Sequence, residues 1–245
     1  NLVTGASYKI VDGIVIALFV GAFYTQMYNY GLQWNPEITL LNVLLMFIAT
    51  DLFMYFSHLC QHKIRWFWTA HVTHHSSKNM NLSTALRQNF LIGLNGSGAM
   101  IWLPMALIGF DAKWALICLE ANLVYQFFLH SEMFDAPKWF GKVFNTPSHH
   151  RVHHGSNPEQ IDRNFGGVLI VWDKLFGTFQ AEETAGEVVY GVARMPEKPY
   201  NPFYMQTYEL VAMLKDVVKY KDLRILWMPP EWVERRKPAQ LIKAD

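Results

Sequence analysis

The histidines of this chain lie in one stretch of sequence and at regular spacings. The sequence holds ten of them, all between residues 58 and 154. Three clusters read HLCQH, HVTHH and HRVHH, and one further histidine stands alone between the second and the third cluster. Residues three and four apart share one face of a helix, so each cluster could direct its imidazoles toward one point. Because imidazole is a ligand for iron, zinc, copper and nickel, the spacing predicts a metal site.

The number of histidines favours two metal ions over one, because a mononuclear site uses only three or four protein ligands. The lone histidine is expected where a membrane helix ends, at the same depth as the three clusters. The predicted ligands are nine residues: His58, His62, His71, His74, His75, His130, His150, His153 and His154.

The ligand chemistry favours iron as the metal. The chain has no ExxH pattern of the kind that supplies carboxylate ligands in ferritin-like dimetal proteins. Neutral nitrogen ligands leave two ions strongly charged and open to dioxygen. We therefore expect two iron ions, with zinc as a substitute in a purified sample.

Three further polar residues are expected beside the metals. His149 stands one position before the third cluster, about 100° away from the helix face of that cluster. Asp51 shares a helical stripe with His58 and His62, and it could accept a hydrogen bond from a histidine ring or bond to another helix. Gln126 lies one turn before His130 and could contact a metal through water.

Three residues flank the histidine clusters on their polar side and could hold a lipid head group. They are Asn81, Arg87 and Arg151. The two arginines could equally make structural ion pairs, and the sequence leaves both interpretations open.

The elements that position these residues are predicted to be membrane helices. The chain is 51% hydrophobic and only 17% charged, whereas soluble domains carry about 25% charged residues. About 20 apolar residues cross a hydrocarbon core of about 30 Å. Four stretches approach that length, although an alternative is a set of buried helices in a large soluble core. The predicted spans cover about residues 10–30, 38–60, 90–110 and 114–134.

Short loops join the first span to the second and the third to the fourth, so the four spans form two hairpins. The polar segments beside the histidines carry most of the nearby lysines and arginines, which predicts that they face the cytoplasm. Residues 61–89 and 135–245 would form a cytoplasmic helical cap that holds the dimetal site. The chain is thus predicted to be one all-α integral membrane domain, residues 1–245. The host membrane would be the endoplasmic reticulum in a eukaryote or the inner membrane in a bacterium.

Within the cap, residues 208–214 and 217–226 could lie at the membrane interface or pack against the cap. The net charge of +1 gives no reason to expect nucleic acid as a partner. The sequence contains no glycine-rich phosphate loop and no GxSxG. Cys60 and Cys118 stand in apolar runs and are expected to be small buried residues without a redox role.

Longer segments around the histidines resemble a known family. WFWTAHVTHHSSKNMNLSTALRQN, YQFFLHSEMF and NTPSHHRVHHGSNPEQIDRNFGGVLIVWDKLFGTF are similar to the fatty acid hydroxylase/sterol desaturase superfamily, over about residues 40–180. The segments look most like its alkylglycerol monooxygenase branch and the bacterial sterol-desaturase-like relatives of that branch. The resemblance implies four membrane helices, two irons on the nine histidines, and hydroxylation of a lipid C–H bond by dioxygen and two electrons.

The resemblance also implies an electron donor and a substrate class. In the alkylglycerol branch the reductant is tetrahydrobiopterin and the substrates are ether lipids, whose hydroxylation cleaves the ether. Elsewhere in the superfamily the electrons come from a b-type cytochrome. Members of the branch tend to have an acidic residue directly after HxxxH, where this chain has Lys63.

Several other functions stay open from the sequence alone. The same site could act as a sterol or fatty-acyl desaturase or hydroxylase, because both reactions begin with removal of a hydrogen. A non-oxidative zinc-binding membrane protein is a more distant alternative. A zinc hydrolase would need a carboxylate base, as in HExxH, and the chain has none. A transporter would place its ligands at the middle of the bilayer.

Overall fold

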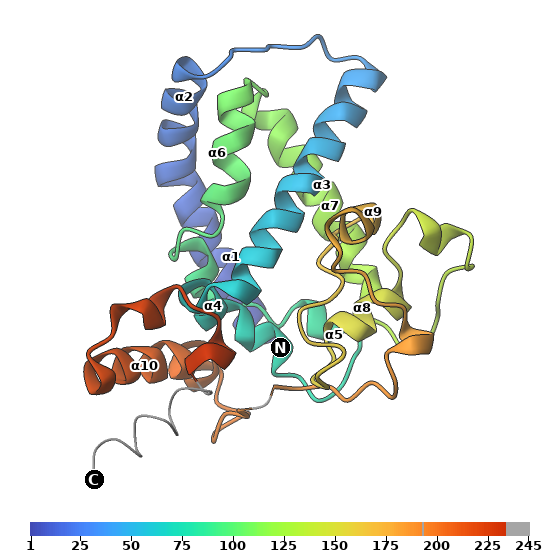
Figure 1. Ribbon diagram of the computed structural model, residues 1–245. Coiled ribbons are helices and arrows are strands. Elements are labelled where there is room, and N and C mark those ends of the chain that lie inside the picture. Colours follow the sequence, from blue (N-terminus) through green and yellow to red (C-terminus); the bar gives the residue numbers. More distant parts are fainter. Residues whose placement is uncertain (193, 234–245) are drawn as a thin grey trace.

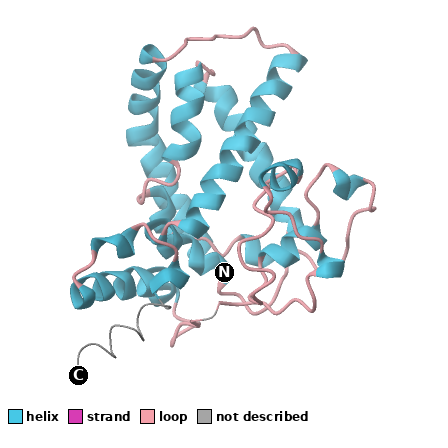
Figure 2. Ribbon diagram, viewed as in Figure 1, coloured by secondary structure: helices cyan, strands magenta, loops and turns pink. Residues whose placement is uncertain are grey.

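The structure is a computed structural model that describes residues 1–192 and 194–233. Regular structure in these residues is helical, and Figure 2 shows no strand among them. Two isolated bridges, Phe144 with Leu169 and Gly155 with Tyr190, are the extended pairings that they contain. The all-α prediction is therefore confirmed for the described part of the chain.

Helices of the predicted membrane region form the upper part of the molecule, where α2, α3 and α6 run beside one another (Figure 1). A π-helical turn, η1 (Ile16–Val20), joins the first two helices, which are bent relative to each other. The helices of this bundle are α1 (Leu2–Val15), α2 (Gly21–Tyr30), α3 (Leu40–Lys63), α6 (Ala99–Ile108) and α7 (Ala112–Leu129).

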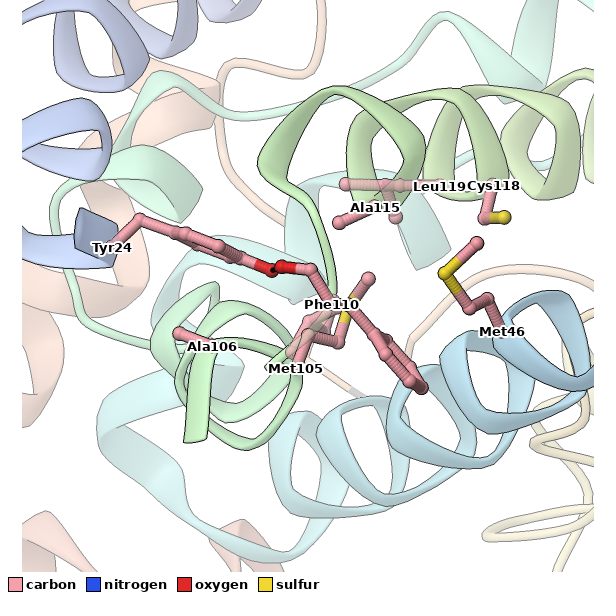
Figure 3. Packing of buried hydrophobic residues seen from close by; sticks show 9 residues of the cluster. Tyr24, Met46, Met105, Ala106, Phe110, Ala115, Cys118 and Leu119 are labelled. Carbon is pink, nitrogen blue, oxygen red and sulfur yellow. Dashed lines mark hydrogen bonds between the residues drawn. The ribbon is translucent and has the colours of Figure 1, made fainter. Parts of the chain in front are cut away.

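An apolar core holds the bundle together. Side chains from α2, α3, α6 and α7 meet in it, among them Tyr24, Met46, Met105 and Cys118 (Figure 3). The Tyr24 hydroxyl donates a hydrogen bond to the carbonyl of Phe110 at 2.8 Å, so the one polar atom of that ring has a partner. Outward-facing leucines and isoleucines of α1 and α3 are exposed, as expected for helices that contact lipid.

One helix of the described residues, Leu40–Lys63, is long and apolar enough to cross a membrane. The bent pair of α1 and α2 meets the same criteria when it is taken as one span. The first predicted span begins too late, since α1 starts at Leu2, and the fourth extends too far, since α7 stops at Leu129.

The prediction of a continuous helix over residues 90–110 is wrong. The segment contains a 3-10 turn, η2 (Phe90–Gly93), then irregular backbone, and then α6 with ten residues. Ten helical residues extend only about 15 Å. Gly96 adopts a left-handed conformation (φ +87°), and the Asn95 side chain accepts a hydrogen bond from the backbone of Ser97. These residues satisfy the backbone outside a helix and so interrupt the apolar run.

The remaining helices and turns lie below and beside this bundle (Figure 1). Thr146 and Asn201 cap the two helices that begin with proline, and proline is favoured at the first position of a helix. The helices are α4 (Arg65–His75), α5 (Leu82–Ala85), α8 (Pro147–His153), α9 (Val171–Phe176) and α10 (Pro202–Tyr220). The turns are η3 (Phe140–Lys142), η4 (Glu182–Thr184) and η5 (Leu223–Leu226).

Helix α10 packs beneath α4, which carries three of the histidines. The buried Arg65 of α4 makes ion pairs with Glu209 at 3.0 Å and with Asp216 at 2.9 Å. The hydroxyl of Thr73 donates to the carbonyl of Met205 at 2.8 Å. The opposite face of α10 exposes an apolar stripe, so the helix both packs against the cap and presents a hydrophobic surface. That stripe consists of Phe203, Val211, Leu214 and Val218.

Candidate metal centre

Nine histidines gather into two neighbouring groups, and within each group one ring nitrogen of every member lies within 4.8 Å of those of the others. The five-histidine group consists of His58, His62, His71, His75 and His153. The four-histidine group consists of His74, His130, His150 and His154. The residues that the fold brings together are the nine that the spacing singled out.

Each HxxHH cluster divides its rings between the two groups. In the second cluster His71 and His75 join the five-histidine group and His74 joins the four-histidine group. In the third cluster the first and last histidines again stay together: His150 and His154 join the four-histidine group and His153 joins the five-histidine group. The expectation that each cluster points at one site therefore holds for HLCQH, whose His58 and His62 are both in the five-histidine group, and is wrong for the two HxxHH clusters. Positions i and i+4 differ by about 40° around a helix, whereas positions i+3 and i+4 differ by about 100°. Among several ring contacts between the two groups, the stacked pair of His75 and His154 is the closest, with centroids 4.4 Å apart.

The separations between ring nitrogens match those of ligands on a metal ion. In the five-histidine group the Nε2 atom of His71 lies 3.0 Å from that of His58 and 3.1 Å from that of His75. In the four-histidine group the Nε2 atom of His130 lies 3.0 Å from that of His150. Two nitrogens at about 2.1 Å from an ion are about 3.0 Å apart at a right angle and about 3.4 Å apart at a tetrahedral angle. The donor sets therefore fit two ions.

Backbone carbonyls orient several rings through their outer nitrogens. The Nδ1 atom of His58 lies 2.9 Å from the carbonyl of Phe165, and that of His153 lies 2.8 Å from the carbonyl of Arg163. A carbonyl can only accept, so each Nδ1 carries the proton and each Nε2 keeps its lone pair for a metal. The carbonyl of Gln126 does the same for His130 at 2.9 Å.

The loop of residues 162–167 supplies two of these carbonyls, and we call it the acceptor loop. The Asp173 carboxylate accepts hydrogen bonds from the backbone N–H groups of Phe165 at 2.7 Å and Gly166 at 2.8 Å. Asp162 and Asn164 adopt the left-handed conformation that aspartate and asparagine tolerate better than most residues. The acceptor loop and Asp173 were missed by sequence reasoning, because a carbonyl has no signature in the sequence.

Asp162 is a further partner of the five-histidine group that the sequence reasoning missed. Its carboxylate lies 3.4 Å from the Nδ1 atom of His62 and also pairs with Lys63. Burial alone would raise the pKa of Asp162, but His62 and Lys63 stabilise the carboxylate and bring its pKa below the ordinary value. The charged carboxylate can therefore accept from His62 and orient that ring.

The histidine rings are shielded from water. Burial lowers the pKa of His75, His150 and His154 well below the ordinary value, and the neighbouring histidines lower it further. These rings are therefore neutral near pH 7, which is the form that binds a metal.

Asp51 makes structural bonds and does not contact a histidine. It accepts hydrogen bonds from the backbone N–H groups of Val168 at 2.8 Å and Leu169 at 3.0 Å, and from the Trp172 indole at 2.8 Å. It also accepts one from the side chain of Asn122 at 2.6 Å. Of the two roles expected for this carboxylate, the structure favours the bond to other elements, because Asp51 ties α9 and the segment before it to α3 and α7.

His149 lies outside both histidine groups. Its ring contacts the ring of Phe179, with centroids 5.3 Å apart, and packs against Gly141. Its backbone carbonyl accepts a hydrogen bond from Asn164 at 2.9 Å. This position agrees with the expectation that His149 is not one of the ligands. A role beside the metals stays a prediction for this ring.

The three residues expected at a lipid head group have partners inside the protein. Asn81 caps α5. Arg87 donates to the carbonyl of Thr73, and so fixes the end of α4. Arg151 donates to both carboxylate oxygens of Glu182 at 2.7 Å. Each of these side chains therefore has a structural role, as the sequence allowed for the two arginines, and none lines the cavity beside the histidines. A head-group role for them stays a prediction.

A cavity of 980 Å³ lies against both histidine groups. Most of its wall is apolar and comes from α1, α6 and α7, with Val15, Trp102 and Phe127 as examples. Rings of both groups line the cavity: His58, His71, His74, His130 and His150. An apolar molecule in this cavity would therefore lie beside both candidate metal sites.

The sequence of this chain is similar to those of known proteins. A family model described as fatty acid hydroxylase matches residues 43–178. Alkylglycerol monooxygenase of Homo sapiens is 39% identical over 184 residues, which are 75% of this chain and 39% of that protein. Alkylglycerol monooxygenase of Xenopus tropicalis is 40% identical over 213 residues, 87% of this chain and 46% of that protein.

More distant similarity extends to the ornithine lipid hydroxylase of Rhizobium tropici, 26% identical over 147 residues, which are 60% of this chain and 43% of that protein. This chain spans less than half the length of these curated relatives. No solved structure matches it. The family model covers more than half of the chain and includes all ten histidines. The chain therefore belongs to the fatty acid hydroxylase family.

Proposed function

We propose that this chain is a membrane-bound di-iron oxygenase that hydroxylates a C–H bond of a lipid. The observation that carries the proposal is the apolar cavity whose wall includes rings of both histidine groups. The reaction consumes dioxygen, two electrons and two protons, and it yields an alcohol and water. The family membership and the monooxygenase and hydroxylase names of the relatives support the same reaction class.

The nine gathered histidines are the proposed ligands, five for one ion and four for the other. Zinc in proteins is almost always four-coordinate and tetrahedral in closed sites, so a set of five histidine nitrogens, all within 4.8 Å of one another and two pairs of them only 3.0 and 3.1 Å apart, favours iron. The chemistry supplied by bound iron is the activation of dioxygen and the transfer of one oxygen atom to carbon. The protein contributes the fixed tautomers of the rings, their neutral charge and the exclusion of water.

The cavity favours a lipid with a long hydrocarbon chain as the substrate. Its apolar wall can keep the chain out of water, and burial of each methylene group from water is worth about 0.8 kcal/mol. The relatives named alkylglycerol monooxygenase support an ether lipid, whose hydroxylation next to the ether oxygen would give a hemiacetal that collapses to an aldehyde. Desaturation or hydroxylation of a sterol or fatty-acyl chain at the same site is the alternative.

The proposed topology has four passes in two hairpins, with the histidines on the cytoplasmic side. Helix α3 and the bent pair of α1 and α2 are the two spans that length and composition support. The irregular segment before α6 includes Gly93, Gly96 and Gly98, all of which line the cavity. Irregular backbone is tolerated at membrane depth where it lines a cavity, so residues 90–110 can still make a broken third pass.

The electron donor is proposed to be tetrahydrobiopterin or a b-type cytochrome system. The resemblance to the alkylglycerol branch implies the pterin. At the position where that branch tends to carry an acid, Lys63 pairs with Asp162. Supplying each reductant to the purified protein with the same lipid would decide between the two.

Metal analysis of the purified protein after anaerobic loading with ferrous iron tests the proposal. We expect about two irons per chain, and about one after His153→Ala or His154→Ala, which remove a ligand from different groups. His149→Ala is the matched control and should keep both ions, because its ring lies against Phe179. Dioxygen consumption coupled to the oxidation of an added ether lipid is the second measurement. A single tightly held metal without dioxygen consumption would refute the oxygenase.

A further inference from the structure

Gln126 is a polar side chain in the wall of an otherwise largely apolar cavity. We infer that its amide oxygen accepts a hydrogen bond from a hydroxyl group of the lipid, and that Asp51 and Asn122 position it for this role. The inference rests on the proposed lipid oxidation and adds a specificity-determining residue to it, one that selects lipids with a free hydroxyl a few bonds from the carbon that is oxidised.

The argument starts from the direction of the hydrogen bonds between these three side chains. The Asp51 carboxylate can only accept, so the Asn122 group 2.6 Å away from it must be the amide NH₂. The Asn122 carbonyl oxygen then faces Gln126 and accepts from its NH₂ at 2.6 Å. The carboxylate thereby fixes the orientation of both amides and leaves the carbonyl oxygen of Gln126 as the free acceptor.

Burial keeps this chain of hydrogen bonds in one arrangement. The Asp51 and Asn122 side chains are 0% exposed. Gly167 covers them so closely that a methyl group there would lie 2.7 Å from the Asn122 oxygen and 2.8 Å from the Asp51 oxygen. The Gln126 nitrogen would be 3.1 Å from the same methyl group. Reversal of either amide would therefore place two donors or two acceptors in contact in a space without room for water.

The place of Gln126 along α7 sets where the lipid hydroxyl would lie. Its backbone carbonyl accepts from the Nδ1 atom of His130, a member of the four-histidine group. Side chains four apart on a helix have their Cβ atoms about 5–6 Å apart, and His130 follows Gln126 by one such step. A hydroxyl held by Gln126 is therefore a few ångströms from the candidate metal site, and the oxidised carbon is its near neighbour.

The charges along the cavity favour an uncharged head group there. Among the described lining residues Lys9 is the one lysine or arginine, and it pairs with Glu120 at 3.5 Å. Glu120 precedes His130 by ten positions on α7, which is about 15 Å along the helix. A phosphate bound near Gln126 would therefore meet an amide oxygen and no cationic side chain, whereas a neutral hydroxyl would find an acceptor.

The test compares two lipids that differ in one group. One is an alkylglycerol ether, and the other is the same lipid with the hydroxyl nearest the ether converted to a methoxy group. Loss of a single hydrogen bond to a buried acceptor corresponds to about a tenfold effect. We expect wild-type protein to prefer the hydroxyl lipid about tenfold in kcat/KM, and also in Kd measured without dioxygen.

Gln126→Leu and the nearly isosteric Gln126→Met should bring both ratios close to one, mainly through weaker binding of the hydroxyl lipid. Gln61→Leu is the matched control. Gln61 also lines the cavity, but it hydrogen-bonds to Ser57 and not to Asp51, Asn122 or Gln126, so the preference for the hydroxyl lipid should persist. Equal use of both lipids by the wild type would overturn the inference. So would an equal loss on both lipids in the Gln126 variants, which would indicate a water-mediated role at the metal. Oxidation of neither lipid by the wild type would instead count against the proposed function.

Discussion

Replacing Asp51 by asparagine should destabilise the fold far more than its small change in shape suggests. Each carboxylate oxygen accepts from two donors: one from Asn122 and Val168, the other from Leu169 and Trp172. An asparagine at this position has a single oxygen, so its NH₂ group would face two donors in either orientation. The variant therefore leaves two buried donors without an acceptor.

The magnitude follows from those two donors. Each buried polar group without a partner costs about 1–3 kcal/mol, so Asp51→Asn should cost about 2–6 kcal/mol. For a domain of about 150–250 residues this corresponds to a fall of roughly 4–24 °C in the melting temperature. Thermal unfolding in detergent, followed by tryptophan fluorescence, measures it. Glu120→Gln is the matched control, because that half-exposed carboxylate pairs with Lys9 at the surface and should contribute less than about 1 kcal/mol.

The same variant should affect the two histidine groups unequally. Asp51 holds Val168 and Leu169, directly after the acceptor loop that orients His58 and His153. Both of those histidines belong to the five-histidine group. We therefore expect the iron of that group to be released first in a chelator titration. An Asp51→Asn protein with the melting temperature and the two irons of the wild type would refute the reasoning.

Three other changes test separate parts of the structure. Asp162→Asn weakens an acceptor of the five-histidine group, so metal affinity there should fall about 10–100-fold; unchanged competition with a chelator would contradict this. Gly167→Ala puts a methyl group 2.7 Å from a buried oxygen and should cost about 1–3 kcal/mol of stability. The control is Gly13→Ala within α1, whose methyl group meets nothing within 4 Å, so it should not lower the melting temperature. If the apolar stripe of α10 lies in lipid, a nitroxide spin label at Val218 should collide more often with dissolved oxygen than with a polar nickel complex. A label at Lys219 is the control and should show the opposite preference. The same opposite preference at Val218 would place the stripe in water.

The sequence was sufficient to identify the histidines that gather, because helical spacing is a local property. Each of the three clusters lies on or at the end of one helix, and the lone His130 directly follows another. The all-α fold class could be predicted as well, because long apolar runs and a low content of charged residues can be read from the sequence without knowing distant contacts. The length of the third predicted span did not, since an apolar run of 21 positions contains Gly96 in a left-handed turn that hydropathy does not register.

The residues whose roles the sequence left open are those whose role depends on a distant partner. Arg151 and Arg87 looked available for a head group because their partners, Glu182 and Thr73, stand 31 and 14 positions away. The same limitation hid the acceptor loop, because every residue has a carbonyl and only the fold selects Phe165 and its neighbours. It also left the role of Asp51 undecided, since three of its four donors follow it by more than 110 positions. A carboxylate in a membrane helix must find partners somewhere. The partners of Asp51 include Val168 and Leu169, which directly follow the acceptor loop. Because that loop orients both His58 and His153, Asp51 acts on two rings of the site, whereas a direct contact would act on one.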